Sequence, residues 1–167
     1  QMLKDEAAIS SEKMQKINLK SIVMSVVDDF NSIYNSKRGI SIKLKTNGLE
    51  DYVILGIENR IEQIIANLLE NSISFSEDNQ EIHVELNQKE NGNINLNVID
   101  QGAGFKENDT KKIFNRFYSN RPEKFGEHSG LGLNIVKNLV DLHNGQIFAK
   151  NNKNKGAKIE IIFPKSK

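Results

Sequence analysis

Four polar side chains recur at helical spacing in a segment that is otherwise mainly apolar: Asn67, Glu70, Asn71 and Ser74. Because they stand at positions i, i+3, i+4 and i+7, a helix would align them in one stripe. The amide oxygen of Asn71 is a hard, neutral ligand that can complete a Mg²⁺ site whose other ligands are phosphate oxygens and waters. Glu70 beside it can orient a water or assist proton transfer. The competing interpretation is a solvated helix face in an asparagine-rich chain.

A single aspartate follows an alternating apolar segment. Counting by two from Ile94 places Asp100 on the inward face of a strand. Burying an unpaired carboxylate is costly, and the amino group of adenine is a donor that could pair with it. Gly102 and Gly104 would let the backbone pass close to such a base. The alternative is an ordinary Asp-Gly turn, and the third glycine of a dinucleotide-binding fingerprint is missing.

A second glycine-rich segment, Ser129-Gly130-Leu131-Gly132-Leu133, leads directly into a helical pattern. Exposed amides at a helix start, together with the helix dipole, favour phosphate binding, although these residues could also be an ordinary flexible loop. Arg116 and Arg121 precede the segment, and guanidinium groups bind phosphate bidentately. We expect this contact from Arg121 first. The chain has no Gly-x-x-x-x-Gly-Lys-Ser/Thr motif, which excludes a P-loop site.

Three segments show the apolar spacing of helices. The first follows Asn18, a suitable N-cap, and ends at Gly39, which suits a helix stop. The second covers residues 58–75 and carries the polar stripe, and the third covers residues 131–143. Residues 1–16 have too few apolar side chains to bury a face, so we expect them to be the end of a helix that belongs to another domain.

Strands are predicted by alternating or continuous apolar residues at 40–44, 52–55, 82–86, 94–98, 147–149 and 159–163. Glu90-Asn91-Gly92 favours a hairpin between two of them. The mostly polar residues 105–129 are typical of a long functional loop or lid. Together these elements predict an α+β fold, a two-layer α/β sandwich whose mixed, mainly antiparallel sheet is covered on one face by about three helices.

The bulk composition limits the alternatives. A length of 167 residues suits one domain, and 23 basic against 22 acidic residues give no general attraction for nucleic acid. The chain has no cysteine, hence no disulfide, cysteine-ligated zinc or thiol catalysis. No apolar run of about 18 residues occurs, and Gln1 to Ser10 lack an apolar signal core, so we expect neither a membrane span nor a secretory leader here.

Together these segments resemble the sequence boxes of the GHKL (Bergerat-fold) ATPases, in the same order and spacing. Asn67 to Asn71 resembles the N box, Asp100 to Gly104 the G1 box, Ile113 to Tyr118 the F box and Ser129 to Leu133 the G2 box. Gly156 to Ile159, before a strand that ends at Pro164, resembles the closing segment of such domains. Residues 18–165 as a whole are similar to the catalytic domain of bacterial sensor histidine kinases.

The resemblance implies a domain that binds Mg-ATP and transfers the γ-phosphoryl group to a histidine, from which it passes to a response-regulator aspartate. It implies that Asn71 holds Mg²⁺, that Asp100 binds adenine, and that Asn67, Glu70 and Arg121 act in catalysis. The residues implied for nucleotide contact are Asn67, Asn71, Asp100, Gly102, Gly104, Arg116, Phe117, Arg121, Ser129, Gly130, Leu131, Gly132 and Leu133.

The chain departs from the family pattern at two positions. Ser74-Phe75 stands where Lys-Tyr often follows the N box, which removes a cationic phosphate contact, and Ala157 stands where a threonine is frequent. These departures keep a non-catalytic, nucleotide-binding pseudokinase open as an alternative. A serine kinase of the anti-sigma type and a gyrase-like ATPase are further alternatives, although the compact lid and the missing transducer domain argue against the gyrase-like machines.

None of the three histidines, His83, His128 and His143, has the sequence setting of a phosphoacceptor. We therefore expect residues 1–16 to end a dimerisation and phosphotransfer helix whose histidine lies upstream, and residues 17–167 to be the ATP-binding domain, with a lid at about 105–129. The expected partners are that dimerisation domain and a response regulator, but no nucleic acid. We expect a monomeric, cytoplasmic fragment of a homodimeric parent that could be anchored in the inner membrane.

Overall fold

The computed structural model describes residues 13–47, 52–106, 110–115 and 131–166. Its helices are α2 (Leu19–Arg38), α3 (Glu58–Phe75) and α4 (Leu131–Leu142), together with a short 3-10 helix, η1 (Thr110–Phe114). Its strands are β1 (Gln15–Asn18), β2 (Ser41–Thr46), β3 (Val53–Gly56), β4 (Glu81–Gln88), β5 (Ile94–Ile99), β6 (Gln146–Asn151) and β7 (Ala157–Phe163).

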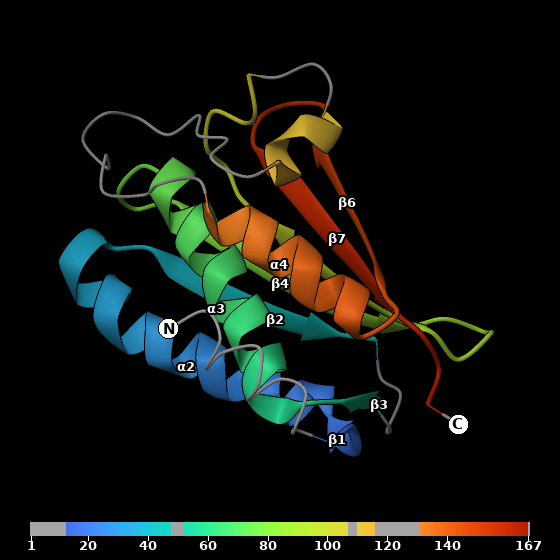
Figure 1. Ribbon diagram of the computed structural model, residues 1–167. Helices are drawn as coiled ribbons and strands as arrows, with labels where there is room; N and C mark the ends of the chain where they lie inside the picture. Colours follow the sequence, from blue (N-terminus) through green and yellow to red (C-terminus); the bar gives the residue numbers. More distant parts are fainter. Residues whose placement is uncertain (1–12, 48–51, 107–109, 116–130, 167) are drawn as a thin grey trace.

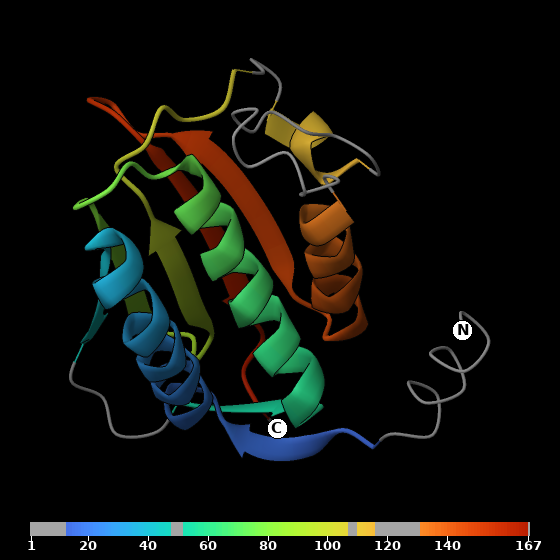
Figure 2. The same ribbon diagram turned by 90° about the vertical axis from the view of Figure 1, so that its left-hand side faces the viewer.

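Five of the strands form one sheet in the order β2-β4-β5-β7-β6. β2 and β4 run parallel, whereas the other neighbouring strands are antiparallel. Helices α2, α3 and α4 lie on one face of this sheet (Figure 1), and the view turned by 90° shows α3 between α2 and α4 (Figure 2). The prediction of a two-layer, mainly antiparallel α+β sandwich is confirmed.

The helices begin and end close to where the sequence predicts. Asn18 is the N-cap of α2, and its side-chain oxygen accepts a hydrogen bond from the Ser21 amide at 3.2 Å. Gly39 ends α2 in the left-handed conformation, with φ 64°, which glycine adopts without steric cost. Helix α3 covers the predicted residues 58–75. The site-bearing helix is therefore placed by signals that are local in the sequence.

One element differs from the sequence prediction. Gln15 and Lys16, which we expected to end a helix, form the first half of β1 instead. This strand pairs antiparallel with β3, with Ile17 opposite Ile54, and the two make a separate two-stranded sheet. Ile17 and Ile54 are both buried, so pairing with β3 covers an apolar side chain that a lone helix would expose.

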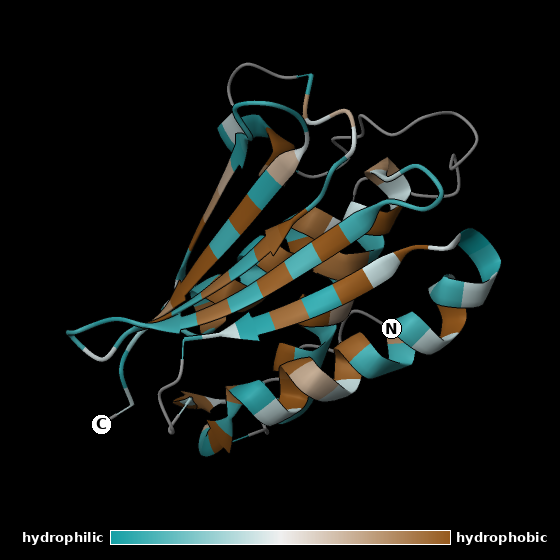
Figure 3. Ribbon diagram, turned by 180° about the vertical axis from the view of Figure 1, so that it is seen from behind, coloured by the Kyte–Doolittle hydropathy of each residue, from teal (hydrophilic) through white to brown (hydrophobic). Residues whose placement is uncertain are grey.

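The core lies between the helices and the sheet. Ile82, Val84 and Leu86 of β4 are fully buried on its inner face, as their alternation predicts. Seen from behind, hydrophilic and hydrophobic residues alternate along the strands of the other face, which the described helices leave uncovered (Figure 3). None of the helices in the described ranges is both long and apolar enough to cross a membrane.

Candidate functional site

The polar stripe of α3 becomes more buried toward the end of the helix. Glu70 is exposed and Asn67 is half-buried, whereas Asn71 is 3% exposed and Ser74 is 1% exposed. The Ser74 hydroxyl donates to the backbone carbonyl of Asn71 at 2.7 Å. A solvated helix face would expose all four side chains, so the second half of the stripe does not fit that interpretation. Ser74 helps to close the turn that carries Asn71.

Asp100 lies at the end of β5 and is 3% exposed, as the alternation from Ile94 predicts. Its Oδ1 accepts hydrogen bonds from the backbone amides of Gly102 at 2.9 Å and Ala157 at 3.1 Å. Burial raises the pKa of the Asp100 carboxyl, and the two amide bonds oppose that increase. Both bonds use Oδ1, so they orient the carboxylate without engaging Oδ2.

The glycines after Asp100 allow close backbone contact. A Cβ atom on Gly102 would collide with the carbonyl oxygen of Phe75, the last residue of α3. Gly104 has φ 82°, and a Cβ there would lie 2.7 Å from the side-chain oxygen of Asn151. The loop that begins at Asp100 therefore rests directly on the end of the helix that carries Asn71.

Asn151, at the end of β6, holds the far end of this loop. Its Oδ1 accepts from the Phe105 amide at 2.7 Å, and its Nδ2 donates to the Phe105 carbonyl at 2.9 Å. The Phe105 ring packs edge-on against Phe75, with ring centroids 5.7 Å apart. Sequence reasoning missed Asn151, because one asparagine in an asparagine-rich chain gives no signal of its own.

Helix α4, whose start was predicted to bind phosphate, packs against α3. A Cβ on Gly132, in the first turn of α4, would meet no atom of the described residues within 4 Å. Leu133, predicted for nucleotide contact, is 5% exposed and belongs to the hydrophobic core. Asn134 donates to the Phe114 carbonyl at 3.1 Å and thereby ties α4 to η1. Sequence reasoning did not single out Asn134.

Several predicted site residues lie outside the described part of the chain. These are Arg116, Phe117, Arg121, Ser129 and Gly130, as well as the side chain of Leu131. Among the described residues, the loop that begins at Asp100 contacts the end of α3 at Phe75, and Asn71 and Ser74 lie within the last turns of that helix. The contribution of the predicted lid stays a prediction.

A cavity of about 420 Å³ lies elsewhere, between η1, α4 and β6. Its lining residues are Thr110, Lys111, Phe114, Asn115, Lys137, Ile147, Phe148 and Ala149. Of the predicted site residues that the structure describes, none lines this cavity, and the described part of its wall is mainly apolar. That part includes no buried carboxylate or amide side chain like those of Asp100 and Asn71, so we place the candidate site at Asp100 rather than here.

The described histidines have structural roles. His143 is 3% exposed; its Nδ1–H donates to the Leu139 carbonyl at 2.7 Å, and its Nε2 accepts from the Ile57 amide at 3.1 Å. Burial lowers the pKa of His143, and the bond to Leu139 opposes this decrease. His83 lies on β4, with its Nε2 3.1 Å from Glu81 Oε1. His128 is outside the described residues.

The curated relatives are named as sensor proteins or as sensor histidine kinases. Sensor protein ChvG of Rhizobium meliloti is 34% identical over 161 residues, which are 92% of this chain and 28% of ChvG. The signal transduction histidine-protein kinase BaeS of Escherichia coli is 26% identical over 164 residues, which are 97% of this chain and 34% of BaeS. The chain therefore spans roughly a third of the length of these two relatives.

Solved structures share the fold. The catalytic domain of histidine kinase ThkA, in a nucleotide-free form, matches with a TM-score of 0.80 and 25% identity over 92% of this chain and 97% of that domain. The mycobacterial sensor histidine kinase MprB matches with a TM-score of 0.78 and 22% identity over 92% of this chain and 98% of the MprB chain. The α+β fold is thus that of histidine kinase catalytic domains.

Residues 56–167 match the family described as histidine kinase-, DNA gyrase B-, and HSP90-like ATPases. The match includes the polar stripe of α3, the Asp100 loop and the start of α4. An ATPase domain of this kind implies ATP binding. Because the match covers more than half of the chain, the protein belongs to the family of histidine kinase-, DNA gyrase B-, and HSP90-like ATPases.

Proposed function

We propose that this chain is the catalytic, ATP-binding domain of a two-component sensor histidine kinase. The observation that carries the proposal is the buried Asp100 carboxylate, held by two backbone amides in a loop that rests on the end of the Asn71-bearing helix. The names of the relatives support the same activity, and the serine-kinase and pseudokinase alternatives have no comparable support.

The adenine base would bind at Asp100. A carboxylate oxygen is an acceptor for the exocyclic amino group of adenine, and Oδ2 is the oxygen that the two amide bonds leave unengaged. Gly102 and Gly104 let the loop that carries Asp100 rest directly on the end of α3 and on Asn151, which fixes where the base would bind. Low exposure at Asp100 strengthens this pairing, since water competes poorly for a buried acceptor.

Mg²⁺ would be held by Asn71 together with the phosphate oxygens of ATP. The donor set fits the ion, because an amide oxygen is a hard ligand. The Asn71 side chain is buried, and the Ser74 hydroxyl bonds to the Asn71 backbone carbonyl and so helps to hold the turn that carries this side chain. Bound there, Mg²⁺ would neutralise phosphate charge. Glu70 is the residue before Asn71, and Asn67 lies about one turn earlier along the helix, where both can orient phosphate or water.

The phosphate end would be completed by groups from the lid and from the start of α4. We propose Arg121 and Arg116 as the cationic contacts, and the amides of Gly130 to Leu133 as the anion-binding helix start. In the transfer step an imidazole nitrogen of the acceptor histidine forms a bond to the γ-phosphorus while the bond to the bridging oxygen breaks, and ADP leaves with that oxygen.

The acceptor histidine would belong to a dimerisation and phosphotransfer domain of the same protein. His143 is unsuited, because both of its nitrogens bond to the backbone and its side chain is buried. A response regulator would take the phosphoryl group from that histidine. Histidine kinase ThkA has been solved in complex with a response regulator, TrrA, and this supports a partner of the same class here.

The test is a transfer assay with γ-labelled ATP and a separately produced dimerisation domain from the same parent protein. Label on a histidine, stable to base and lost in acid, is the expected result. Acid-stable label on serine would favour the serine-kinase alternative, and no label despite ATP binding would favour the pseudokinase. The Asn71→Ala chain, folded but without the metal ligand, should show no Mg²⁺-dependent transfer.

A further inference from the structure

Helix α3 ends without a cation of its own. Its last turn contains no basic residue, and its C-cap, Ser76, is extended with φ −84° and ψ 149° rather than left-handed. The carbonyl groups at a helix end need hydrogen-bond donors, and the helix dipole favours a positive charge there. This end matters because it carries Asn71 and supports the Asp100 loop.

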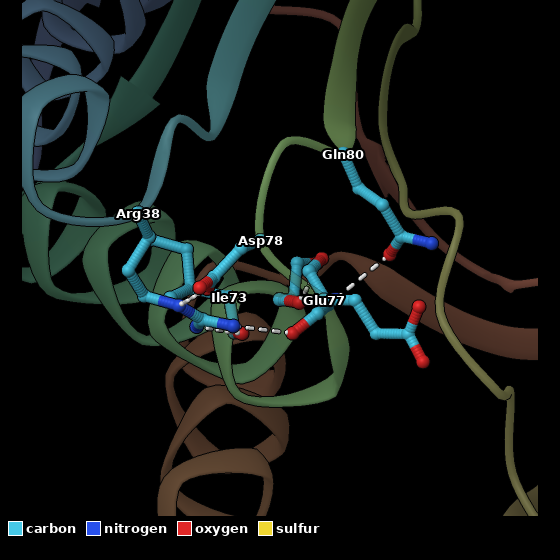
Figure 4. Close-up of polar contacts among 7 residues, drawn as sticks. Arg38, Ile73, Glu77, Asp78 and Gln80 are labelled. Atoms are coloured by element: carbon cyan, nitrogen blue, oxygen red, sulfur yellow. Dashed lines mark hydrogen bonds and ion pairs between the residues drawn. The ribbon is translucent and has the colours of Figure 1, made fainter.

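Arg38 supplies the missing charge from a different helix (Figure 4). Its Nη1 donates to the Ile73 carbonyl at 2.9 Å and its Nη2 to the Ser76 carbonyl at 2.6 Å, both at the end of α3. Its Nε donates to Asp78 Oδ1 at 2.7 Å, in the turn that follows. The Arg38 side chain is 16% exposed and that of Asp78 is 66% exposed, so the two bonds to carbonyls are partly shielded from water whereas the bond to Asp78 lies at the surface. We call Arg38 and its three acceptors the Arg38 clamp.

The backbone of Arg38 is fixed to the same turn. The Asn79 amide donates to the Arg38 carbonyl at 2.9 Å, and the Ser41 amide donates to the Gln80 carbonyl at 3.3 Å. Gly39 lies directly against the Asn79 side chain, where a Cβ would collide. The guanidinium therefore extends from a rigid base, so its geometry can determine where the end of α3 lies.

The Asp100 loop contacts the clamped end of α3. Gly102 rests on the Phe75 carbonyl. In the sequence, Phe75 stands between Ile73 and Ser76, whose carbonyls accept hydrogen bonds from Arg38. Gln101, beside Asp100, accepts a hydrogen bond from the Glu81 amide at 2.8 Å, just after the clamped turn. A shift of this end would thus change the position of Asn71 relative to Asp100.

We propose that Arg38 is a positioning residue that fixes the metal-binding part of the site, at Asn71, relative to the adenine-binding part, at Asp100. The proposal rests on the proposed function. Arg38 touches neither ATP nor Mg²⁺ in this assignment and acts only through the end of α3. The planar guanidinium supplies three N–H groups to three different acceptors, which the single ammonium of lysine cannot reproduce.

A ligand that spans both parts of the site should depend on Arg38, whereas a ligand that occupies one part should not. We would measure the affinity for Mg-ATP by calorimetry and that for adenosine by NMR titration. In Arg38→Gln and Arg38→Lys, Mg-ATP affinity should fall about tenfold, the expected cost of one lost charged hydrogen bond. Adenosine affinity should change by less than about twofold, which corresponds to much less than the energy of one such bond.

Lys37→Ala is the matched control. It removes an exposed cation from the same turn of α2 and should change neither affinity.

Each outcome is decisive. Equal weakening for both ligands would mean that Arg38 only stabilises the fold, and unaltered Mg-ATP binding in Arg38→Lys would mean that charge alone suffices; either result overturns the proposal. If Arg38→Gln does not fold, as circular dichroism would reveal, Arg38→Lys carries the test. A wild-type chain that binds neither ligand would instead overturn the proposed function itself.

Discussion

At the scale of single residues, Asp100 holds a charge where the protein interior disfavours it. Its raised pKa means that the folded chain binds a proton more readily than the unfolded chain at pH values above the ordinary 3.8. Stability from this group is therefore present at low pH and is lost as the pH rises through the raised pKa. A residue that costs stability at neutral pH is a candidate for function rather than for folding.

Replacing Asp100 by asparagine should separate these two effects. Asparagine keeps an oxygen for the Gly102 and Ala157 amides but carries no charge, so the free energy of unfolding without nucleotide at pH 7 should not decrease. ATP affinity should fall by about tenfold or more, because an amide nitrogen would face the adenine amino group. Chemical denaturation and calorimetry measure the two quantities.

Guanine nucleotides provide the control for that variant. If Asp100 recognises the base, its replacement should reduce the preference for ATP over GTP. Equal weakening for both nucleotides, or a marked loss of stability in the ligand-free variant, would contradict the assignment of Asp100 to adenine.

The sequence predicted the burial of those site residues whose orientation follows from the local periodicity of a helix or strand. Asp100 was placed inward by alternation along β5, and it is 3% exposed. Its partner Ala157 is 57 residues away, and Asn151 is 46 residues from Phe105, so no local pattern contains either contact. Arg38 was missed for the same reason, because its acceptors lie 35 to 40 residues further along the chain.

At the scale of elements, the contact between the Asp100 loop and α3 admits no side chain at Gly102. Gly102→Ala should lower the free energy of unfolding by about 2 kcal/mol, because the new methyl group collides with the Phe75 carbonyl and the backbone must move. Nucleotide affinity should fall as well, since the loop that holds Asp100 is displaced. Urea unfolding followed by circular dichroism measures the first effect.

Gly132→Ala is the matched control for stability. In the first turn of α4 the same methyl group would meet no atom of the described residues, and alanine is the better helix former, so this variant should be more stable by roughly 0.5 kcal/mol. Similar losses of stability in both variants would mean that the close contact at Phe75 is not what distinguishes Gly102.

Element boundaries were predictable where capping and periodicity coincide. α3 covers residues 58–75 as predicted, and α2 lies between the expected Asn18 cap and Gly39 stop. β1 was missed, because four residues with one buried side chain show no strand period by themselves. Its strand conformation comes from pairing with β3, which a local pattern does not reveal.

At the scale of the whole molecule, His143 joins the end of α4 to the start of α3 through Leu139 and Ile57. Its pKa is lowered in the folded chain, which therefore takes up a proton at lower pH than the unfolded chain, where the histidine titrates near the ordinary value of 6.5. Below that pH the unfolded state binds more protons, so the free energy of unfolding should decrease as the pH falls. Denaturation between about pH 7.5 and 5.5 measures this slope, a range that spans the ordinary histidine pKa.

His143→Gln should flatten that slope. Asp100 contributes to the pH dependence with the opposite sign, but it contributes equally in wild type and in the variant and so cancels in the comparison. A slope that survives in His143→Gln would assign the pH dependence to other groups.

The fold class could be predicted from the sequence because helices and hairpin-connected strands both show a local periodicity of apolar residues. The strand order could not be read in the same way, since the pairing of β2 with β4 joins segments on either side of α3.

That parallel pair has a consequence for the order of folding. The hairpins β4–β5 and β6–β7 close over short loops, so we expect them early. β2 and β4 are separated by β3 and α3, and β5 and β7 by a still longer stretch that includes η1, α4 and β6, so both pairings can form only after those segments are in place. These two pairings should therefore be late events, and the pairing of β2 with β4 brings with it the seating of α2, the helix that carries Arg38. The nucleotide site would then acquire its final geometry in the last step of folding.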